Sequence, residues 1–208
     1  MRQRRGVAMT PKPFSQACER NRDPILGVLR TQFADRHHVL EVGSGTGQHA
    51  VYFAAALPQL IWQTSERAEH LSGLRRWLDE AALANTPAPL SLDVGGTWPH
   101  GPFDAVFSAN TLHIMSWPEV ETFFAALPSI CSADAKLAVY GPFNYGGAFT
   151  SASNAEFDRS LKSRDARMGI RDVEAVDALA STLGFSLLDD VAMPANNRCR
   201  VWRRRPTA

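Results

Sequence analysis

The sequence contains little cysteine and no excess of either charge. Its three cysteines are an odd number and form no C-x-x-C pair, so the pattern favours neither a disulfide framework nor a zinc site. Lysine and arginine total 22 against 21 acidic residues, unlike the strongly basic footprint of a nucleic-acid-binding protein. The histidines form no matched set of metal ligands. We therefore expect no bound metal and no nucleic acid as a partner.

Long apolar runs and a targeting segment are also absent. No stretch approaches the about 20 apolar residues that cross a bilayer. The basic start, residues 1–6, is not followed by the apolar core of a secretory signal. These absences predict a cytoplasmic protein without a membrane partner.

A length of 208 residues fits one α/β domain better than two. We expect residues 1–13 to form a flexible tail and residues 14–208 to form the domain. Within the domain, short apolar runs alternate with helical patterns, which is typical of a parallel sheet with helices on both faces. The expected strands lie at residues 39–42, 60–64, 90–94, 103–108, 137–140, 187–191 and 199–202, and the expected helices at 50–57, 71–78, 120–127 and 173–183.

Two segments depart from this alternation. Asp23 and Pro24 fit the cap and the first position of a helix that precedes the first strand. The polar segment 143–171 follows the fifth strand and contains one expected short helix near residues 156–162. Doubly wound folds bind ligands beyond the carboxyl ends of their strands. We therefore expect this insert at that edge, with the N-terminal helix as a lid.

A glycine-rich loop follows the first strand. Gly43, Gly45 and Gly47 give the spacing G-x-G-x-G, around Ser44, and Gln48 stands where a dinucleotide-binding loop would have its third glycine. Such glycines let the backbone turn sharply and let a ligand lie against it. Glu41 precedes the loop, and a carboxylate suits the ammonium group of S-adenosylmethionine (SAM). The pattern therefore favours SAM as the cofactor, beside the alternative of a turn without a ligand.

Acidic residues also follow the next two strands. Glu66 ends the second strand, near the offset at which an acid accepts hydrogen bonds from ribose hydroxyls. Asp93 ends the third strand, where it is placed to accept a bond from the adenine amino group, and Val94 follows it. Taken alone, Glu66 or Asp93 is equally well explained as a residue that caps a helix. Three acids on successive strands beside this loop favour a cofactor site.

Further stretches extend this pattern along most of the chain: SQACERNRDPIL at residues 15–26, LEVGSGTGQ at 40–48, ANTLHI at 109–114, YGPF at 140–143, SNAEFD at 153–158, GIRD at 169–172 and MPANN at 193–197. Together they resemble the class I SAM-dependent methyltransferase fold, and more narrowly the methyltransferase-like 26 family. The resemblance covers about residues 14 to 203. It implies a single-domain Rossmann-like α/β fold with a seven-stranded, mostly parallel sheet and a reversed last strand. Glu66 departs from the aspartate expected there, which changes the reach of the carboxylate and not its chemistry.

Methyl transfer is an in-line displacement at an activated sulfonium, so orientation supplies much of the catalysis. A base is needed only where the acceptor carries a proton. His113 follows the fourth strand at the cofactor edge, and a neutral imidazole suits that task near pH 7. A structural, hydrogen-bonded histidine is the alternative interpretation.

Other polar residues fall near the same edge. We expect Tyr140, Asn144, Asn196 and Asn197 to contact the substrate, and Arg20 and Asn21 to contact the amino-acid end of the cofactor. Asn110 is also expected to bind the cofactor. The alternatives are a core tyrosine, a turn formed by the asparagine pair and a solvated helix face around residue 20.

The leading hypothesis is a SAM-dependent methyltransferase that acts on an unidentified small molecule. A non-catalytic SAM-binding sensor or partner subunit is a second hypothesis, and a nicotinamide-dependent oxidoreductase is a third, against which Gln48 argues. The sequence leaves open the acceptor atom, the need for a base and the oligomeric state.

Overall fold

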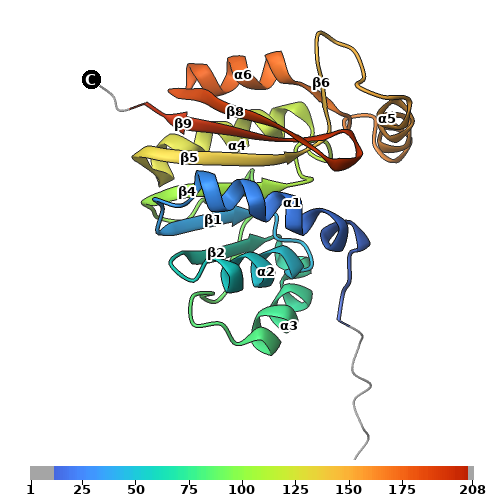
Figure 1. Ribbon diagram of the computed structural model, residues 1–208. Coiled ribbons are helices and arrows are strands. Elements are labelled where there is room, and N and C mark those ends of the chain that lie inside the picture. Colours follow the sequence, from blue (N-terminus) through green and yellow to red (C-terminus); the bar gives the residue numbers. More distant parts are fainter. Residues whose placement is uncertain (1–11, 206–208) are drawn as a thin grey trace, which may run out of the picture.

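The apolar runs of the sequence form the strands of a seven-stranded sheet in the computed structural model, which describes residues 12–205 (Figure 1). The strand order is β3-β2-β1-β4-β5-β9-β8, and only β9 runs antiparallel to its neighbours β5 and β8. The predicted mostly parallel sheet with a reversed last strand is confirmed. The strands are β1 (His38–Val42), β2 (Ile61–Glu66), β3 (Leu90–Ser91), β4 (Phe103–Ala109), β5 (Cys131–Gly141), β8 (Phe185–Met193) and β9 (Asn197–Arg204).

Helices cover both faces of the sheet, because each face is apolar (Figure 1). On one face, α1 (Gln16–Gln32), α2 (Gln48–Ala56) and α3 (Leu71–Ala81) pack around Phe53, Trp62 and Phe107. On the other, α4 (Trp117–Ile130) and α6 (Val173–Thr182) pack around Phe123, Phe124 and Trp202. Two single turns of 3-10 helix, η1 (Ala68–His70) and η2 (Pro194–Asn196), complete the connections.

The polar insert lies beyond the carboxyl ends of the parallel strands. It contains the short parallel strands β6 (Phe143–Asn144) and β7 (Arg171–Asp172), with α5 (Ala152–Arg164) between them. The helix is longer than the expected segment near 156–162, because the side chain of Ser151 caps it by accepting a bond from the N–H of Asn154. Figure 1 shows α5 at the same end of the sheet as the tips of β1, β4 and β5.

The start of α1 corrects a prediction. The helix begins at Gln16 after the cap Ser15, and Pro24, predicted as its first residue, lies inside it. The reason is a tertiary contact: the backbone N–H of Ser15 donates to the side chain of Gln48 at 2.5 Å. This contact at the start of α2 holds an additional helical segment that local capping signals did not predict.

The third strand is also shorter than predicted. It ends at Ser91 instead of Val94, although the N–H of Leu92 still donates to the carbonyl of Glu66. Asp93 begins a turn, because its side chain accepts a 3.0 Å bond from the N–H of Gly95.

The predicted tail needs a correction at its end. Lys12 pairs with Glu80 at 2.7 Å, and the carbonyl of Pro13 accepts a 2.7 Å bond from the indole of Trp77, so these two residues are docked on α3. Residues 1–11 of that tail, and residues 206–208 of the predicted domain, lie outside the described residues. Within residues 12–205, no helix has the length and apolar character needed to span a membrane.

Candidate functional site

The loop between β1 and α2 requires its glycines. Gly43, Gly45 and Gly47 have φ angles of 75°, 55° and 92°, in the left-handed region that other residues rarely adopt. A β-carbon at Gly43 would stand 2.7 Å from Thr111, and one at Gly47 would stand 2.8 Å from Leu74. At Gly45 no atom lies within 4 Å of that position, so the loop backbone faces open space there.

The end of β2 fixes this loop. The carboxylate of Glu66 accepts a 2.7 Å bond from the N–H of Gly45 and a 2.8 Å bond from the N–H of Arg67. The N–H of Ser44 donates to the carbonyl of Ser65 at 2.9 Å. Each carboxylate oxygen of Glu66 retains a lone pair, so the side chain is able to hold the loop and accept a bond from a ligand as well.

A cavity of about 280 Å³ opens at the carboxyl ends of β1 to β4. Six of the residues predicted to bind the cofactor line it together: Gly43, Gly45, Glu66, Asp93, Val94 and Asn110. Apolar side chains, among them Leu92, Ile114 and Met115, complete its walls. Apolar walls with carboxylates among the lining residues suit a nucleoside, whose base is flat and whose ribose carries hydroxyl donors.

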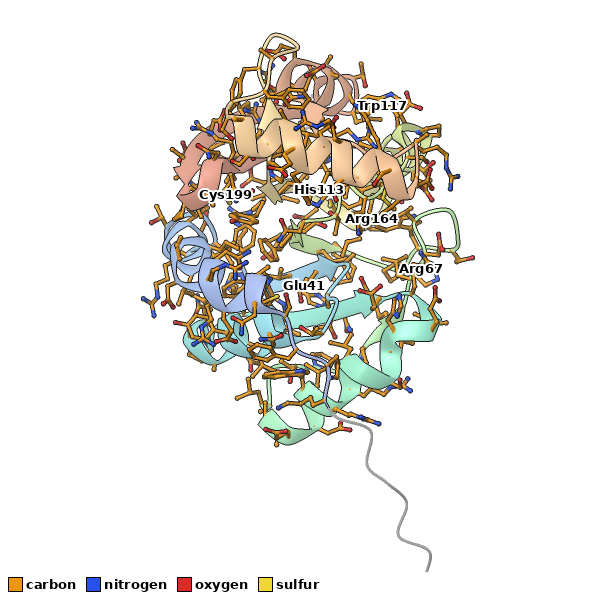
Figure 2. The ribbon with its side chains drawn as sticks, turned by 90° about the vertical axis from the view of Figure 1, so that its right-hand side faces the viewer. Glu41, Arg67, His113, Trp117, Arg164 and Cys199 are labelled. Atoms are coloured by element: carbon orange, nitrogen blue, oxygen red, sulfur yellow. The ribbon has the colours of Figure 1, made fainter. Side chains whose placement is uncertain are left out.

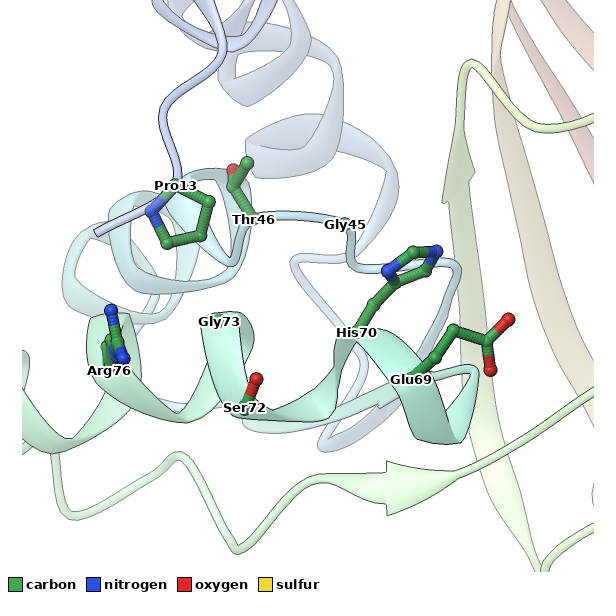
Figure 3. Close-up of a pocket in the computed structure, with 8 residues that line it drawn as sticks. All are labelled: Pro13, Gly45, Thr46, Glu69, His70, Ser72, Gly73 and Arg76. Atoms are coloured by element: carbon green, nitrogen blue, oxygen red, sulfur yellow. The ribbon is translucent and has the colours of Figure 1, made fainter. Parts of the chain in front are cut away.

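A second, larger hollow lies on the other side of the same loop. Figure 3 shows it between the N-terminal segment, the glycine loop and the start of α3. Its volume is about 510 Å³, but Gly45 is the only residue predicted to bind a cofactor among its lining residues. The candidate site is therefore the smaller cavity at the strand ends.

Glu41 and Ser44 lie beneath the cavity and do not line it. Glu41 is within β1, only 1% exposed, and accepts bonds from Ser44 Oγ at 2.8 Å and Trp62 Nε1 at 3.1 Å. Burial raises the pKa of this carboxyl to about 7, the two hydrogen bonds oppose that rise, and the charge of Glu66 adds to it. The structure thus places Glu41 inside the strand and not at its end.

On the α1 side, the sequence interpretation missed a buried polar network. Asn21 Oδ1 lies 2.7 Å from His49 Nε2, and the hydroxyl of Tyr140 also hydrogen-bonds to Asn21. Burial, and then the charge of Arg22, lower the pKa of His49 to about 4, so the neutral ring donates from Nε2. The one feature of the sequence that indicated this network was His49, a histidine in the first turn of the mainly apolar helix α2.

Arg20 is exposed next to this network. It lies near enough to Tyr140 for its charge to oppose the rise that burial causes in the pKa of the tyrosine hydroxyl. Tyr140 itself is 3% exposed at the end of β5. Arg20 and Asn21, the α1 residues predicted to bind the cofactor, therefore lie beside β5 and α2 at the same edge of the sheet as the cavity.

His113 is buried under α5. Its ring meets the ring of Phe157 edge to face at 5.2 Å, and Figure 2 shows it below α5 at the carboxyl edge of the sheet. Burial, and then the charges of Arg171 and Arg164, lower the pKa of His113 to about 4. No group in residues 12–205 hydrogen-bonds to its imidazole. His113 is thus neutral and without a hydrogen bond in the described chain, but it is 6% exposed and does not line the cavity.

The predicted substrate asparagines fall into two groups. Asn144 is 7% exposed, and its Oδ1 is buried without a hydrogen-bond partner in the described chain, next to its β7 neighbour Asp172. In contrast, the side chain of Asn197 turns back to the carbonyls of Pro194 and Ala195 at 3.1 and 3.3 Å. The carbonyl of Asn196 accepts a 3.1 Å bond from Asn154 of α5. Neither Asn196 nor Asn197 lines the cavity.

The same described residues contain no group of three or more histidine, cysteine or acidic side chains able to hold a metal ion.

A family model described as "Protein of unknown function (DUF938)" matches residues 12–204. Solved structures share the fold at low identity. The mitomycin 7-O-methyltransferase MmcR is 21% identical, with a TM-score of 0.76 over 86% of this chain and 52% of that one. The S-adenosylmethionine-dependent methyltransferase SibL is 20% identical, with a TM-score of 0.76 over 92% of this chain and 56% of that one.

An O-methyltransferase family 2 protein from Planctomyces limnophilus DSM 3776, solved in complex with apigenin, is 14% identical. Its TM-score is 0.76 over 88% of this chain and 56% of that one. This chain therefore spans little more than half the length of the proteins it matches. These likenesses show the Rossmann-like fold of class I methyltransferases.

Proposed function

The chain belongs to the family described as protein of unknown function (DUF938), and we propose that it is a SAM-dependent methyltransferase acting on a small molecule. The observation that carries this proposal is the cavity in which Gly45, Glu66 and Asp93 meet beside apolar walls. We also propose that the chain is related to the methyltransferase-like 26 family, which its sequence stretches resemble. A cytoplasmic location stays a prediction of the sequence.

The residues around the cavity fit the parts of SAM. Glu66 would accept bonds from the ribose hydroxyls, and Asp93 with Val94 would border the adenine between Leu92 and Met115. Gly45 leaves open space where a side chain would stand, which permits close approach of a ligand. Asn110 lines the cavity, and we place the amino-acid end between it and the α1 residues Arg20 and Asn21.

Bound SAM would supply an activated methyl group, whose bond to sulfur would break with its electron pair returning to sulfur as the acceptor bonds to the methyl carbon. His113 would take the proton that the acceptor loses, because its imidazole is neutral at pH 7, and its pKa of about 4 makes it a weaker base than a free histidine. Because α1 and α5 both stand at this edge, we propose that they exclude water and align the acceptor, with α1 as a lid.

A nicotinamide-dependent oxidoreductase fits the structure less well. A dinucleotide pyrophosphate binds at the amino terminus of the helix after the glycine loop. Here that terminus carries Gln48, whose side-chain amide donates to Glu19 at 2.8 Å and whose carbonyl accepts from Ser15. A covered helix end with a carboxylate nearby disfavours a doubly charged phosphate group.

Calorimetry with SAM, S-adenosylhomocysteine and NAD tests the cofactor. We expect micromolar-range binding of the first two and none of NAD, and tighter binding of NAD would overturn the proposal. Incubation with methyl-labelled SAM and a metabolite extract, read as a labelled small product, tests catalysis. Binding of SAM without any transferred label would instead favour the non-catalytic sensor or partner subunit.

A further inference from the structure

The inner face of α5 presents an apolar ring and a guanidinium to the region of His113. Phe157 contacts the imidazole, and Arg164 lies seven residues later, two helical turns along the same face. The charge of Arg164 acts on His113, and Figure 2 labels the two residues next to each other below α5. Leu161, between them on this face, is fully buried and fixes the helix in place.

Arg164 has no hydrogen-bond or ion-pair partner within residues 12–205, unlike three other basic residues of this region. Lys162 pairs with Asp158 at 2.7 Å, and Arg167 pairs with Asp165 at 2.7 Å. Arg171 donates to the backbone carbonyls of Leu112, Met115 and Arg167. Each of these three cations is therefore already occupied, while Arg164 is available to a ligand.

Two acidic side chains near this region, Asp158 and Glu119, are occupied as well. Asp158 is 4% exposed, pairs with Lys162 and accepts a 2.9 Å bond from the N–H of Ile170. Glu119 accepts a 2.6 Å bond from the N–H of Ser116 in the capping box of α4. The charges that act on the imidazole of His113 are those of Arg171 and Arg164, so a ligand group beside it meets a positive potential.

Two exposed apolar side chains border this region. Ile114, which follows His113 in the chain and lines the cofactor cavity, is 47% exposed. Phe157 is 38% exposed although its ring contacts the imidazole. Exposed apolar side chains at the rim of a cavity are a feature of ligand-binding surfaces. The body of a ligand placed here would contact these two side chains.

We propose that the methyl acceptor is an aromatic carboxylate, whose flat body lies against Phe157 and Ile114 and whose charge pairs with Arg164. A planar guanidinium matches a carboxylate with two parallel hydrogen bonds, which gives orientation as well as attraction. One unpaired guanidinium matches one negative charge, which favours a carboxylate over a dianionic phosphate. This inference rests on the proposed methyltransferase function and adds the class of substrate.

The test uses the full chain saturated with S-adenosylhomocysteine. The probes are benzoate, the three hydroxybenzoates, cinnamate and indole-3-carboxylate, each beside its neutral amide, with binding followed by ligand-observed NMR and calorimetry. We expect at least one acid to bind, and its amide to bind at least tenfold more weakly. Phenyl phosphate, as a dianionic probe, should bind more weakly than the best acid.

The variants Arg164→Gln and Arg159→Gln form a matched pair. Both arginines are exposed on α5 without an ion-pair partner in the described chain, but Arg159 lies on the opposite side of the helix from Phe157. We expect Arg164→Gln to weaken binding of the best acid at least tenfold and Arg159→Gln to leave it unchanged.

Three outcomes would overturn the inference: no acid binds, acid and amide bind equally, or the two variants behave alike. Binding of S-adenosylhomocysteine distinguishes a failure of the substrate class from a failure of the methyltransferase function. Its affinity should be equal in wild type and both variants. If wild type does not bind S-adenosylhomocysteine at all, the methyltransferase function itself is contradicted.

Discussion

The backbone N–H of Gly45 donates a 2.7 Å hydrogen bond to the carboxylate of Glu66. This bond joins the glycine loop after β1 to the end of β2, across 21 residues of sequence. The side chain that we propose as the ribose ligand therefore also holds the glycine loop in place. A change at Glu66 should alter both the cofactor contact and the shape of the site.

Glu66→Ala should weaken SAM binding about tenfold to a hundredfold, because a charge-assisted hydrogen bond contributes roughly 1.5–3 kcal/mol. It should also lower the melting temperature, since the N–H of Gly45 loses its partner. Asp93→Ala is the comparison, because Asp93 is exposed and its side chain makes only surface contacts in the described chain, a local bond from the N–H of Gly95 and a 3.9 Å ion pair with Arg67. We expect Asp93→Ala to weaken SAM binding while leaving the melting temperature unchanged. Unchanged SAM affinity in both variants would show that these two acids have a structural role and do not bind the cofactor.

Alanine substitutions at Gly45 and Gly47 should have different effects. Both positions have positive φ angles, so each substitution costs about 1–2 kcal/mol in backbone strain. At Gly47 the new β-carbon also meets Leu74 at 2.8 Å, whereas at Gly45 it enters open space at the cavity. We expect Gly47→Ala to lower the free energy of unfolding more than Gly45→Ala does. For the same loss of stability, Gly45→Ala should reduce SAM affinity more. Denaturant unfolding and SAM titration measure the two effects, and the reverse order would contradict this assignment.

Glu41→Gln should stabilise the protein in a pH-dependent way. The native pKa of about 7 lies above the value of 4.5 for an unperturbed glutamate, so the native state keeps a proton that the unfolded chain releases. Stability from this group is full below about pH 4.5 and is lost as the pH rises through 7. Glutamine keeps an oxygen for Ser44 and Trp62 but does not titrate.

The difference in unfolding free energy between Glu41→Gln and wild type should therefore grow by about 2 kcal/mol from pH 5 to pH 8. Denaturant unfolding at several pH values measures it. A difference that is constant with pH would show that the carboxyl of Glu41 does not titrate in this range.

His113→Gln should reduce methyl transfer about a hundredfold to ten-thousandfold if the acceptor loses a proton to this residue. Binding of S-adenosylhomocysteine should be unchanged. Because the pKa of His113 is lowered to about 4, its imidazole stays neutral down to about pH 5. Protonation of His113 should therefore not cause the wild-type rate to fall near pH 6.5. His100→Gln, at an exposed position, is the control. Equal rates in both variants would exclude His113 as the base.

Hydrogen exchange should separate the two halves of α1. Residues 16–22 contact α2 through Gln48 and His49, next to the cavity, so they should gain protection when S-adenosylhomocysteine binds. The second half is anchored by Ile25 and Leu29, both fully buried, and should show little change. Protection confined to the glycine loop would contradict a lid formed by the N-terminal helix.

The order of strands and helices was determined by the sequence alone. Apolar runs such as residues 103–108 and 137–140, separated by helical patterns, specify buried parallel strands because both faces of each strand must be covered. The glycine spacing at residues 43–47 likewise specified the loop, since positive φ angles at all three positions tolerate little else. Glu66 and Asp93 could be placed together in advance because parallel strands end at one edge.

Contacts between distant side chains were decided only by the tertiary structure. Local signals favoured a helix start at Asp23, but the contact between Ser15 and Gln48 moved it to Gln16. Glu41 was expected to contact the ammonium group of the cofactor, but its orientation toward Trp62 depends on how β2 packs beside β1. The position of Arg164 near His113 depends on how α5 docks over the strand ends, and helix docking follows from packing that no local sequence pattern encodes.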